Sequence, residues 1–197
     1  MLLTMKFLVF LFILGPVKDC FAAINLETCR VALGMQTKEI KDEQLSSSST
    51  YSEELLGARY ARLGLNEGAG AWCPGNPISK DHNDEFLEIN LLKLTVISLI
   101  AIQGRDNAES NAVEYATHFK LVYFRQSELP TDDWRRFEYR NYYNYTVMLG
   151  NNNPSQAISH SISPPIIAER VRVYPVNPVD VPLHVCMRVE LYGCPYQ

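Results

Sequence analysis

The segment CMRVELYGC, residues 186–194, lies at the end of the chain and limits how the rest can be arranged. Apolar and polar residues alternate along it, as Met187, Val189 and Leu191 against Arg188, Glu190 and Tyr192. This period of two predicts a β-strand that is buried on one face. Eight extended steps place Cys186 and Cys194 about 26 Å apart, whereas a disulfide needs Cα atoms within about 7 Å. Each cysteine therefore needs a distant partner.

The first residues, MLLTMKFLVFLFILGPVKDCFAA, predict a secretory signal. Lys6 precedes a short apolar run, residues 7–14, which is much shorter than the roughly 20 residues of a membrane span. We place the signal at residues 1–22, with cleavage after Ala22. The alternative of a lipid-modified Cys20 is disfavoured, because a lysine and an aspartate directly precede it. The mature product, residues 23–197, is expected to be one domain that is soluble and outside the cell.

Composition limits the class of partner. The chain has 197 residues, of which 47% are hydrophobic and 20% charged, with 11 Tyr and 8 Phe, so it can build one substantial core. Its formal net charge of −4 predicts no excess of positive charge to attract nucleic acid or anionic membranes. We therefore expect no nucleic-acid partner.

Removing the signal leaves four cysteines: Cys29, Cys73, Cys186 and Cys194. An even number in an oxidising compartment predicts two disulfides. Four cysteines allow three pairings, and the distance argument excludes the one that joins the two C-terminal cysteines, so two pairings stay open. A zinc site is disfavoured, because the sequence has no CxxC pair and no nearby histidine partner.

Short strands separated by turn residues account for most of the chain. The predicted strands are EFLEINL (85–91), LTVISLIAIQG (94–104), FKLVYF (119–124) and RVRVY (170–174). The turn or loop signals are GNNNP (150–154), SPP (163–165) and PVNPVDVP (175–182). Helical periodicity is limited to one or two possible turns in SEELLGARYARL (52–63). The pattern indicates an antiparallel sandwich or barrel.

Seven motifs carry a family resemblance. They are CRVALGM (29–35), LSSSSTYS (45–52), GAWCP (70–74), EFLEINL (85–91), IQGR (102–105), PPIIAERVRVYP (164–175) and CMRVELYGC (186–194). In this order the chain resembles the discoidin (F5/8 type C) domains, and more narrowly the N-terminal domain of the discoidin domain receptors, which are collagen-sensing receptor tyrosine kinases. The resemblance implies an all-β, eight-stranded antiparallel jelly-roll barrel with disulfides Cys29–Cys194 and Cys73–Cys186. It implies a binding module for collagen or another extracellular-matrix protein, with no cofactor.

The resemblance also implies a ligand trench formed by loops at one end of the barrel. Tyr51 stands where the receptors have a Trp, Arg105 keeps their Arg, Glu114 keeps their acidic residue, and His184 stands where they have Asn. An aromatic side chain would cover apolar collagen surface, while the Arg and the acid would engage polar groups. Ala69 replaces an Asp of the receptors, which removes an expected partner of the Arg.

A second hypothesis is a module that binds phospholipid membranes or glycans, as other discoidin domains do. Leu55 and Leu56 are apolar where the receptors have small polar residues, although local packing is the preferred explanation. A third is that the sequence is one end of a longer receptor, whose relatives continue into a membrane span and a kinase. These hypotheses differ in ligand but share the same fold.

Several single residues complete the expectations. No GxSxG or HExxH motif accompanies the histidines, which are expected to be solvated in loops (His82, His118, His160, His184), so we expect no enzyme. Both tryptophans, Trp72 and Trp134, are expected in the core. Asn144 begins the sequon Asn-Tyr-Thr, which would accept a glycan if it is exposed.

Overall fold

The structure is a computed structural model that describes residues 28–107, 112–126, 134–141 and 143–196. The predicted signal, residues 1–22, lies outside these ranges. The elements in chain order are β1 (Val31–Ala32), the 3-10 helix η1 (Asp42–Gln44), β2 (Leu45–Ser47), α1 (Glu53–Leu56), the 3-10 helix η2 (Ala58–Tyr60), β3 (Leu87–Gln103), β4 (Arg105–Asn107), β5 (Ala112–Glu114), β6 (His118–Gln126), β7 (Trp134–Glu138), β8 (Val147–Leu149), β9 (Ile158–Val176) and β10 (Arg188–Pro195).

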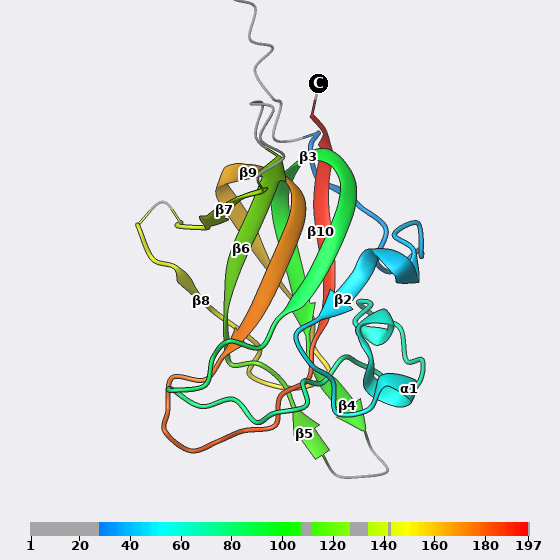
Figure 1. The fold of residues 1–197 in the computed structure, drawn as a ribbon, viewed down its shortest axis with the longest axis vertical. Helices are drawn as coiled ribbons and strands as arrows, with labels where there is room; N and C mark the ends of the chain where they lie inside the picture. The colour runs from blue at the N-terminus through cyan, green and yellow to red at the C-terminus, as the bar shows by residue number, and fades with distance from the viewer. Residues whose placement is uncertain (1–27, 108–111, 127–133, 142, 197) are drawn as a thin grey trace, which may run out of the picture.

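Eight strands form one antiparallel sheet, in the order β1-β10-β3-β9-β6-β7, with β2 paired to β3 and β8 paired to β6. The strands β4 and β5 form a separate two-stranded ribbon. Figure 1 shows that β3 and β9 run side by side along the whole body and bend over together at its upper end. The sheet thereby closes around its core, and the all-β prediction is confirmed.

The two predicted strands at 85–91 and 94–104 are joined into the single strand β3. Leu92 has φ 62° and the pairing with β9 shifts between Asn90 and Thr95, so the strand bends there without ending. The prediction of a turn at Ser163–Pro165 is wrong, because β9 runs through it. These residues lie where the register shifts between Ile97 and Leu99 of β3, and such an irregularity tolerates prolines that cannot donate to the ladder.

The strand that the alternation in CMRVELYGC predicts is confirmed as β10, which lies between β1 and β3. Its apolar residues Val189 and Leu191 are fully buried. The prediction that its other face is open is wrong, because Arg188 and Glu190 are also buried. Gly193 sits at a register shift, where a Cβ atom would overlap the Val96 carbonyl oxygen.

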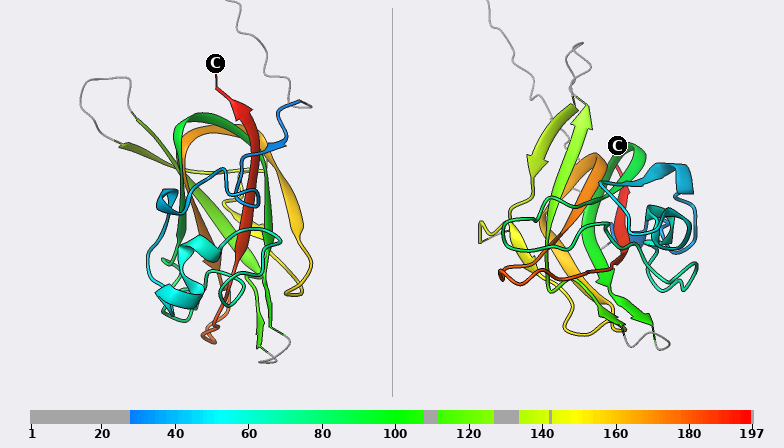
Figure 2. Two further views of the ribbon diagram at one scale, coloured as in Figure 1. Left: turned by 90° about the vertical axis from the view of Figure 1, so that its right-hand side faces the viewer. Right: turned by 60° about the horizontal axis from the view of Figure 1, so that its bottom comes forward.

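Both disulfides have the pairing that the family resemblance implied. Cys29 and Cys194 are joined, with Cα atoms 4.9 Å apart, and Cys73 is joined to Cys186 at 4.2 Å. The chain's C-terminal end lies at the top of Figure 1, while α1, β4 and β5 lie at the bottom. The right-hand view of Figure 2 brings this lower end forward and shows the loops that surround it. The candidate site is at that end.

Candidate functional site

One groove of about 330 Å³ contains all four residues that the resemblance nominated as ligand contacts. Its lining residues are Tyr51, Leu56, Cys73, Pro74, Arg105, Glu114, His184, Val185 and Cys186. They come from the loop before α1 and from α1 itself, from the loop at 70–74, from the ribbon of β4 and β5, and from the segment that enters β10. Segments far apart in the sequence thus form one surface.

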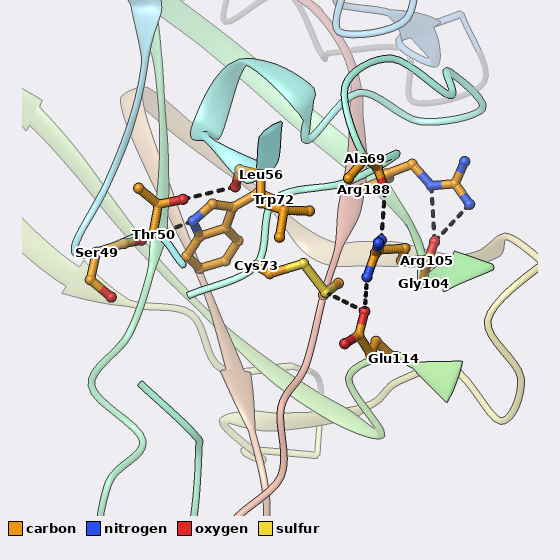
Figure 3. The surroundings of a disulfide bond; sticks show 11 residues. Ser49, Thr50, Leu56, Ala69, Trp72, Cys73, Gly104, Arg105, Glu114 and Arg188 are labelled. Atoms are coloured by element: carbon orange, nitrogen blue, oxygen red, sulfur yellow. Dashed lines mark hydrogen bonds and ion pairs between the residues drawn. A yellow bond between two sulfur atoms is a disulfide. The ribbon is translucent and has the colours of Figure 1, made fainter. Parts of the chain in front are cut away.

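Arg105 and Glu114 face each other because they are register partners in the ribbon of β4 and β5. The Arg105 Nη1 group donates to Glu114 Oε2, and its Nε group donates to the Ala69 carbonyl oxygen at 2.6 Å. Figure 3 shows the guanidinium held between these two acceptors. The side chains of Arg105 and Glu114 are only 11% and 21% exposed, so the pair is largely fixed by the protein. The expected loss of a partner at position 69 is corrected, because the backbone carbonyl of Ala69 supplies one.

The ion pair still leaves polar atoms for a ligand. An arginine has five N–H donors, and Nη2 of Arg105 makes no hydrogen bond to any residue that the structure describes. Glu114 uses Oε2 for the ion pair, and its Oε1 accepts no hydrogen bond from a residue that the structure describes. A donor and an acceptor therefore stand next to each other at the groove. This arrangement suits a ligand that offers an acceptor and a donor of its own, as a peptide backbone does.

The Cys73–Cys186 disulfide forms part of the groove wall and is buried, in an apolar cluster with Leu56 and Ala71. Glu114 Oε2 lies 3.2 Å from Cys186 Sγ. The three residues Cys73, Glu114 and Cys186 are close enough together to resemble a metal site. Metal binding requires thiolates, however, and both sulfurs are bonded to each other. The disulfide is a structural tie between the loop at 70–74 and the start of β10.

An exposed aromatic ring lines the groove, and an exposed leucine lies on the short helix α1 that follows it in the chain. Tyr51 is 67% exposed, and its ring meets the His184 ring edge-on with centroids 6.2 Å apart. The Tyr51 backbone N–H donates to the Cys73 carbonyl at 3.0 Å, which fixes the loop to the disulfide. In the next turn Leu55 is 52% exposed while Leu56 is buried. The preferred explanation of local packing therefore holds for Leu56 and not for Leu55.

The ribbon is anchored to the barrel by Arg188 of β10. Its Nε and Nη2 groups donate to the Gly104 carbonyl at 2.9 and 2.7 Å, directly before Arg105 (Figure 3). Burial lowers the pKa of Arg188, and the negative charge of Asp106 opposes that shift. A buried cation on the last strand thus fixes the residue next to the groove's own arginine.

The remaining predicted residues lie away from the groove. Trp72 is fully buried, as predicted, and its Nε1 group donates to the Ser49 carbonyl at 3.0 Å. The side chain of Trp134 lies outside the part that the structure describes. The expectation of solvated loop histidines is wrong for His118 and His160, which lie half-buried on β6 and β9. Asn144 is exposed in the turn before β8.

A family profile described as the F5/8 type C domain matches residues 44–191, which is most of the chain. The chain belongs to the F5/8 type C (discoidin) domain family. Domains of this family are generally binding modules rather than catalysts, and those of receptor ectodomains are extracellular. The matched region holds no catalytic domain. No helix among the described residues is long and apolar enough to cross a membrane.

Discoidin domain receptors are among the proteins most similar in sequence. The chain is 36% identical over 192 residues to discoidin domain-containing receptor tyrosine kinase B of Caenorhabditis elegans, covering 98% of this chain and 23% of the receptor. It is 36% identical over 166 residues to human epithelial discoidin domain-containing receptor 1, covering 84% of this chain and 17% of the receptor. The chain thus spans about a fifth of the length of these relatives. Discoidin II of Dictyostelium discoideum has a similar structure, with a TM-score of 0.56 at 21% identity over 78% of this chain and 55% of that one.

Sequence reasoning missed parts of this discoidin domain's groove. Val185 and Pro74 line it as direct neighbours of the bonded cysteines, and that adjacency was a signal that could have been used. The Ala69 carbonyl had no signal, because a backbone acceptor is the same for every residue type. Its role is visible only when the loop is placed beside Arg105.

Proposed function

We propose that this discoidin domain is an extracellular module that binds an extracellular-matrix protein, collagen first, through the groove of Tyr51, Arg105, Glu114 and His184. The observation that carries the proposal is that these four residues, nominated by resemblance alone, line one groove. The exposed Tyr51 ring would lie on the proline-rich apolar surface of the ligand. Nη2 of Arg105 and Oε1 of Glu114 would pair with its backbone or side-chain polar groups.

The preformed geometry supports a specific role over a nonspecific one. The groove residues are fixed by a disulfide, an ion pair and backbone hydrogen bonds before a ligand arrives. A prearranged site loses little conformational freedom on binding, so more of the contact energy appears as affinity. A rigid triple helix, which has a repeating and rod-like surface, is a fitting partner for such a groove.

A solid-phase assay that compares triple-helical collagen with the same collagen after heat denaturation tests the proposal. Binding to the native form alone is expected, and Tyr51→Ala should weaken it about tenfold or more, as loss of an aromatic anchor does. Tyr196→Ala is the matched control, because Tyr196 is an exposed tyrosine next to the C-terminus, which lies at the end of the molecule opposite α1, β4 and β5 (Figure 1). Equal binding to both collagens, no binding, or equal effects of the two substitutions would contradict the proposal.

Binding to a phospholipid membrane is a second candidate, and the exposure of Leu55 favours it. Leu55 on α1 offers an exposed apolar side chain of the kind that enters a lipid surface. Co-sedimentation with phosphatidylserine liposomes would then fall on Leu55→Ser. Leu56 is left unchanged, because it is buried and its substitution would test stability instead. The net charge of −4 counts against this candidate.

A further inference from the structure

Exposed apolar side chains gather on β8 and on the turn that precedes it. The exposed fractions are 75% for Tyr143, 66% for Tyr145, 42% for Val147 and 69% for Leu149. Met148, between the last two, is buried in the core. Val147 and Leu149 therefore point outward, as the alternation of a strand requires, while Tyr143 and Tyr145 are exposed in the turn before it. We name these four side chains the β8 patch.

The strand β8 has an open edge. It pairs with β6 over Val147–Leu149, and no other described strand pairs with it. An open edge with apolar side chains is a template for pairing with another chain, and proteins protect such edges with charges, proline, bulges or a cover. The strand itself, Val-Met-Leu, has no charge and no proline. Its length of three residues limits how far a second strand can pair with it, but the four exposed side chains of the β8 patch are covered by no residue that the structure describes.

The single Asn-X-Ser/Thr sequon of the chain, with X not proline, lies inside this patch at Asn144–Tyr145–Thr146. The turn that carries it is well fixed, because Asn141 Oδ1 accepts the N–H groups of Tyr143 and Tyr145 at 3.0 and 2.9 Å. Asn144 has φ 65°, a left-handed conformation that asparagine tolerates better than most residues. Its side chain is exposed, and no described residue makes a hydrogen bond to its side-chain amide group. The turn thus presents this amide to solvent between two exposed tyrosines.

We propose that Asn144 carries an N-linked glycan and that this glycan covers the β8 patch, so that the open edge cannot pair with a second copy of the chain. A glycan is bulky and solubilising, which are the properties the uncovered edge lacks. Its attachment point lies three residues before Val147, and Tyr143 and Tyr145 offer flat apolar surfaces beside its first sugars. The proposal uses the predicted passage through the secretory route, and it is independent of what the groove binds.

The test begins with the full chain secreted from a eukaryotic cell line. Mass spectrometry of its peptides should find carbohydrate on Asn144. The protein is made in cells that attach only high-mannose glycans, so that native treatment with endoglycosidase H trims the glycan of the folded protein to one sugar without adding a charge, and sedimentation velocity is measured over a concentration series. Self-association of the treated protein should begin at about tenfold lower concentration or below, because exposed aliphatic side chains become available for burial. An unmodified Asn144, or a treated protein that sediments like the untreated one, would overturn the proposal.

Two sets of variants separate the effect of losing the glycan from the effect of changing the side chain at position 146. Thr146→Ser keeps the sequon and should behave as the parent, whereas Thr146→Ala abolishes it and should self-associate. Adding Val147→Thr and Leu149→Thr to Thr146→Ala makes the edge polar and should restore the monomer. Association that persists in this triple variant would show that another surface is responsible, and the covering role would be wrong.

Discussion

A stability measurement on Glu190→Gln tests whether the buried polar face of β10 holds the barrel together. Glu190 is 1% exposed, and its carboxylate accepts four backbone N–H groups. Oε1 takes those of Gly34 at 3.3 Å, Met35 at 3.1 Å and Leu191 at 3.0 Å, while Oε2 takes that of Gln36 at 2.9 Å. One side chain therefore accepts the backbone N–H groups of three consecutive residues, 34–36, in the turn after β1.

The magnitude follows from these contacts. Glutamine has the same shape, but only one of its two terminal atoms accepts hydrogen bonds. The Gln36 N–H would face an amide NH₂ group, at a cost of about 1 kcal/mol, the lower end of the range for an unsatisfied donor, because Gln36 is exposed and this hydrogen bond is only part-buried. The three bonds to Oε1 would lose their charge assistance, about 1 kcal/mol each, offset by the smaller cost of burying a neutral group. The net loss is expected to be about 2–4 kcal/mol, or about 4–16 °C in Tm.

Denaturant unfolding of the disulfide-intact protein, followed by tryptophan fluorescence, measures this loss. Trp72 is fully buried and reports on the core. Glu43→Gln is the matched control, because Glu43 is an exposed glutamate and should change the free energy of unfolding by less than about 0.5 kcal/mol. If Glu190→Gln costs no more than this control, the carboxylate is not what fixes the turn, and the reasoning about β10 is refuted.

Three further predictions concern the groove and the barrel wall. Arg105→Lys should weaken binding of triple-helical collagen in the solid-phase assay about tenfold or more, because a single ammonium group cannot reproduce the planar guanidinium contacts; unchanged binding would contradict this. Burial lowers the pKa of His160, partly opposed by its hydrogen bond to a backbone carbonyl, so the folded state prefers the neutral ring. The free energy of unfolding should be retained above about pH 6.5, the pKa of histidine in the unfolded chain, and should decline as the pH falls below it. The decline should be smaller in His160→Phe. If Tm falls equally with pH in the parent and in this variant, the assignment to His160 is refuted. Replacing both Cys73 and Cys186 with serine opens a loop with a sequence separation of 113 residues, for which the chain-entropy model gives a stabilisation of about 5 kcal/mol as an upper figure. Unfolding in denaturant should show that most of this stabilisation is lost. A loss below about 1 kcal/mol would contradict the structural role of this disulfide.

The sequence predicts those parts of the fold that depend on local pattern. The apolar face of CMRVELYGC is buried as its alternation predicts, because period and burial are linked in any strand. The burial of Glu190 could not be predicted, because it depends on the turn after β1, about 155 residues away, folding over the strand. The same limit explains the error at Ser163–Pro165, where pairing with β3 carries the strand through a proline pair that reads locally as a turn.

The residues of the candidate site could not be predicted from local sequence pattern. Tyr51, Arg105, Glu114 and His184 were nominated by resemblance, and no periodicity or spacing connects them, since they span more than 130 positions. The structure brings them to one groove, while their role in binding stays a proposal. Ala69 was expected to remove a partner of Arg105, and its backbone carbonyl accepts from this arginine instead. Donors are satisfied by any acceptor within reach, including backbone carbonyls that a sequence does not display.

The link between barrel and groove lies in the polar residues of β10. Arg188 fixes the Gly104 carbonyl, which precedes Arg105, and the same strand is preceded by Cys186, which is bonded to the loop behind Tyr51. Both sides of the groove are therefore attached to one buried strand. Movement of that strand would shift the arginine and the disulfide together, whereas either tie alone would let the two sides separate. Arg188→Met should consequently reduce ligand affinity even though its side chain does not line the groove, and an unchanged affinity would mean that the ribbon of β4 and β5 is positioned by its own pairing.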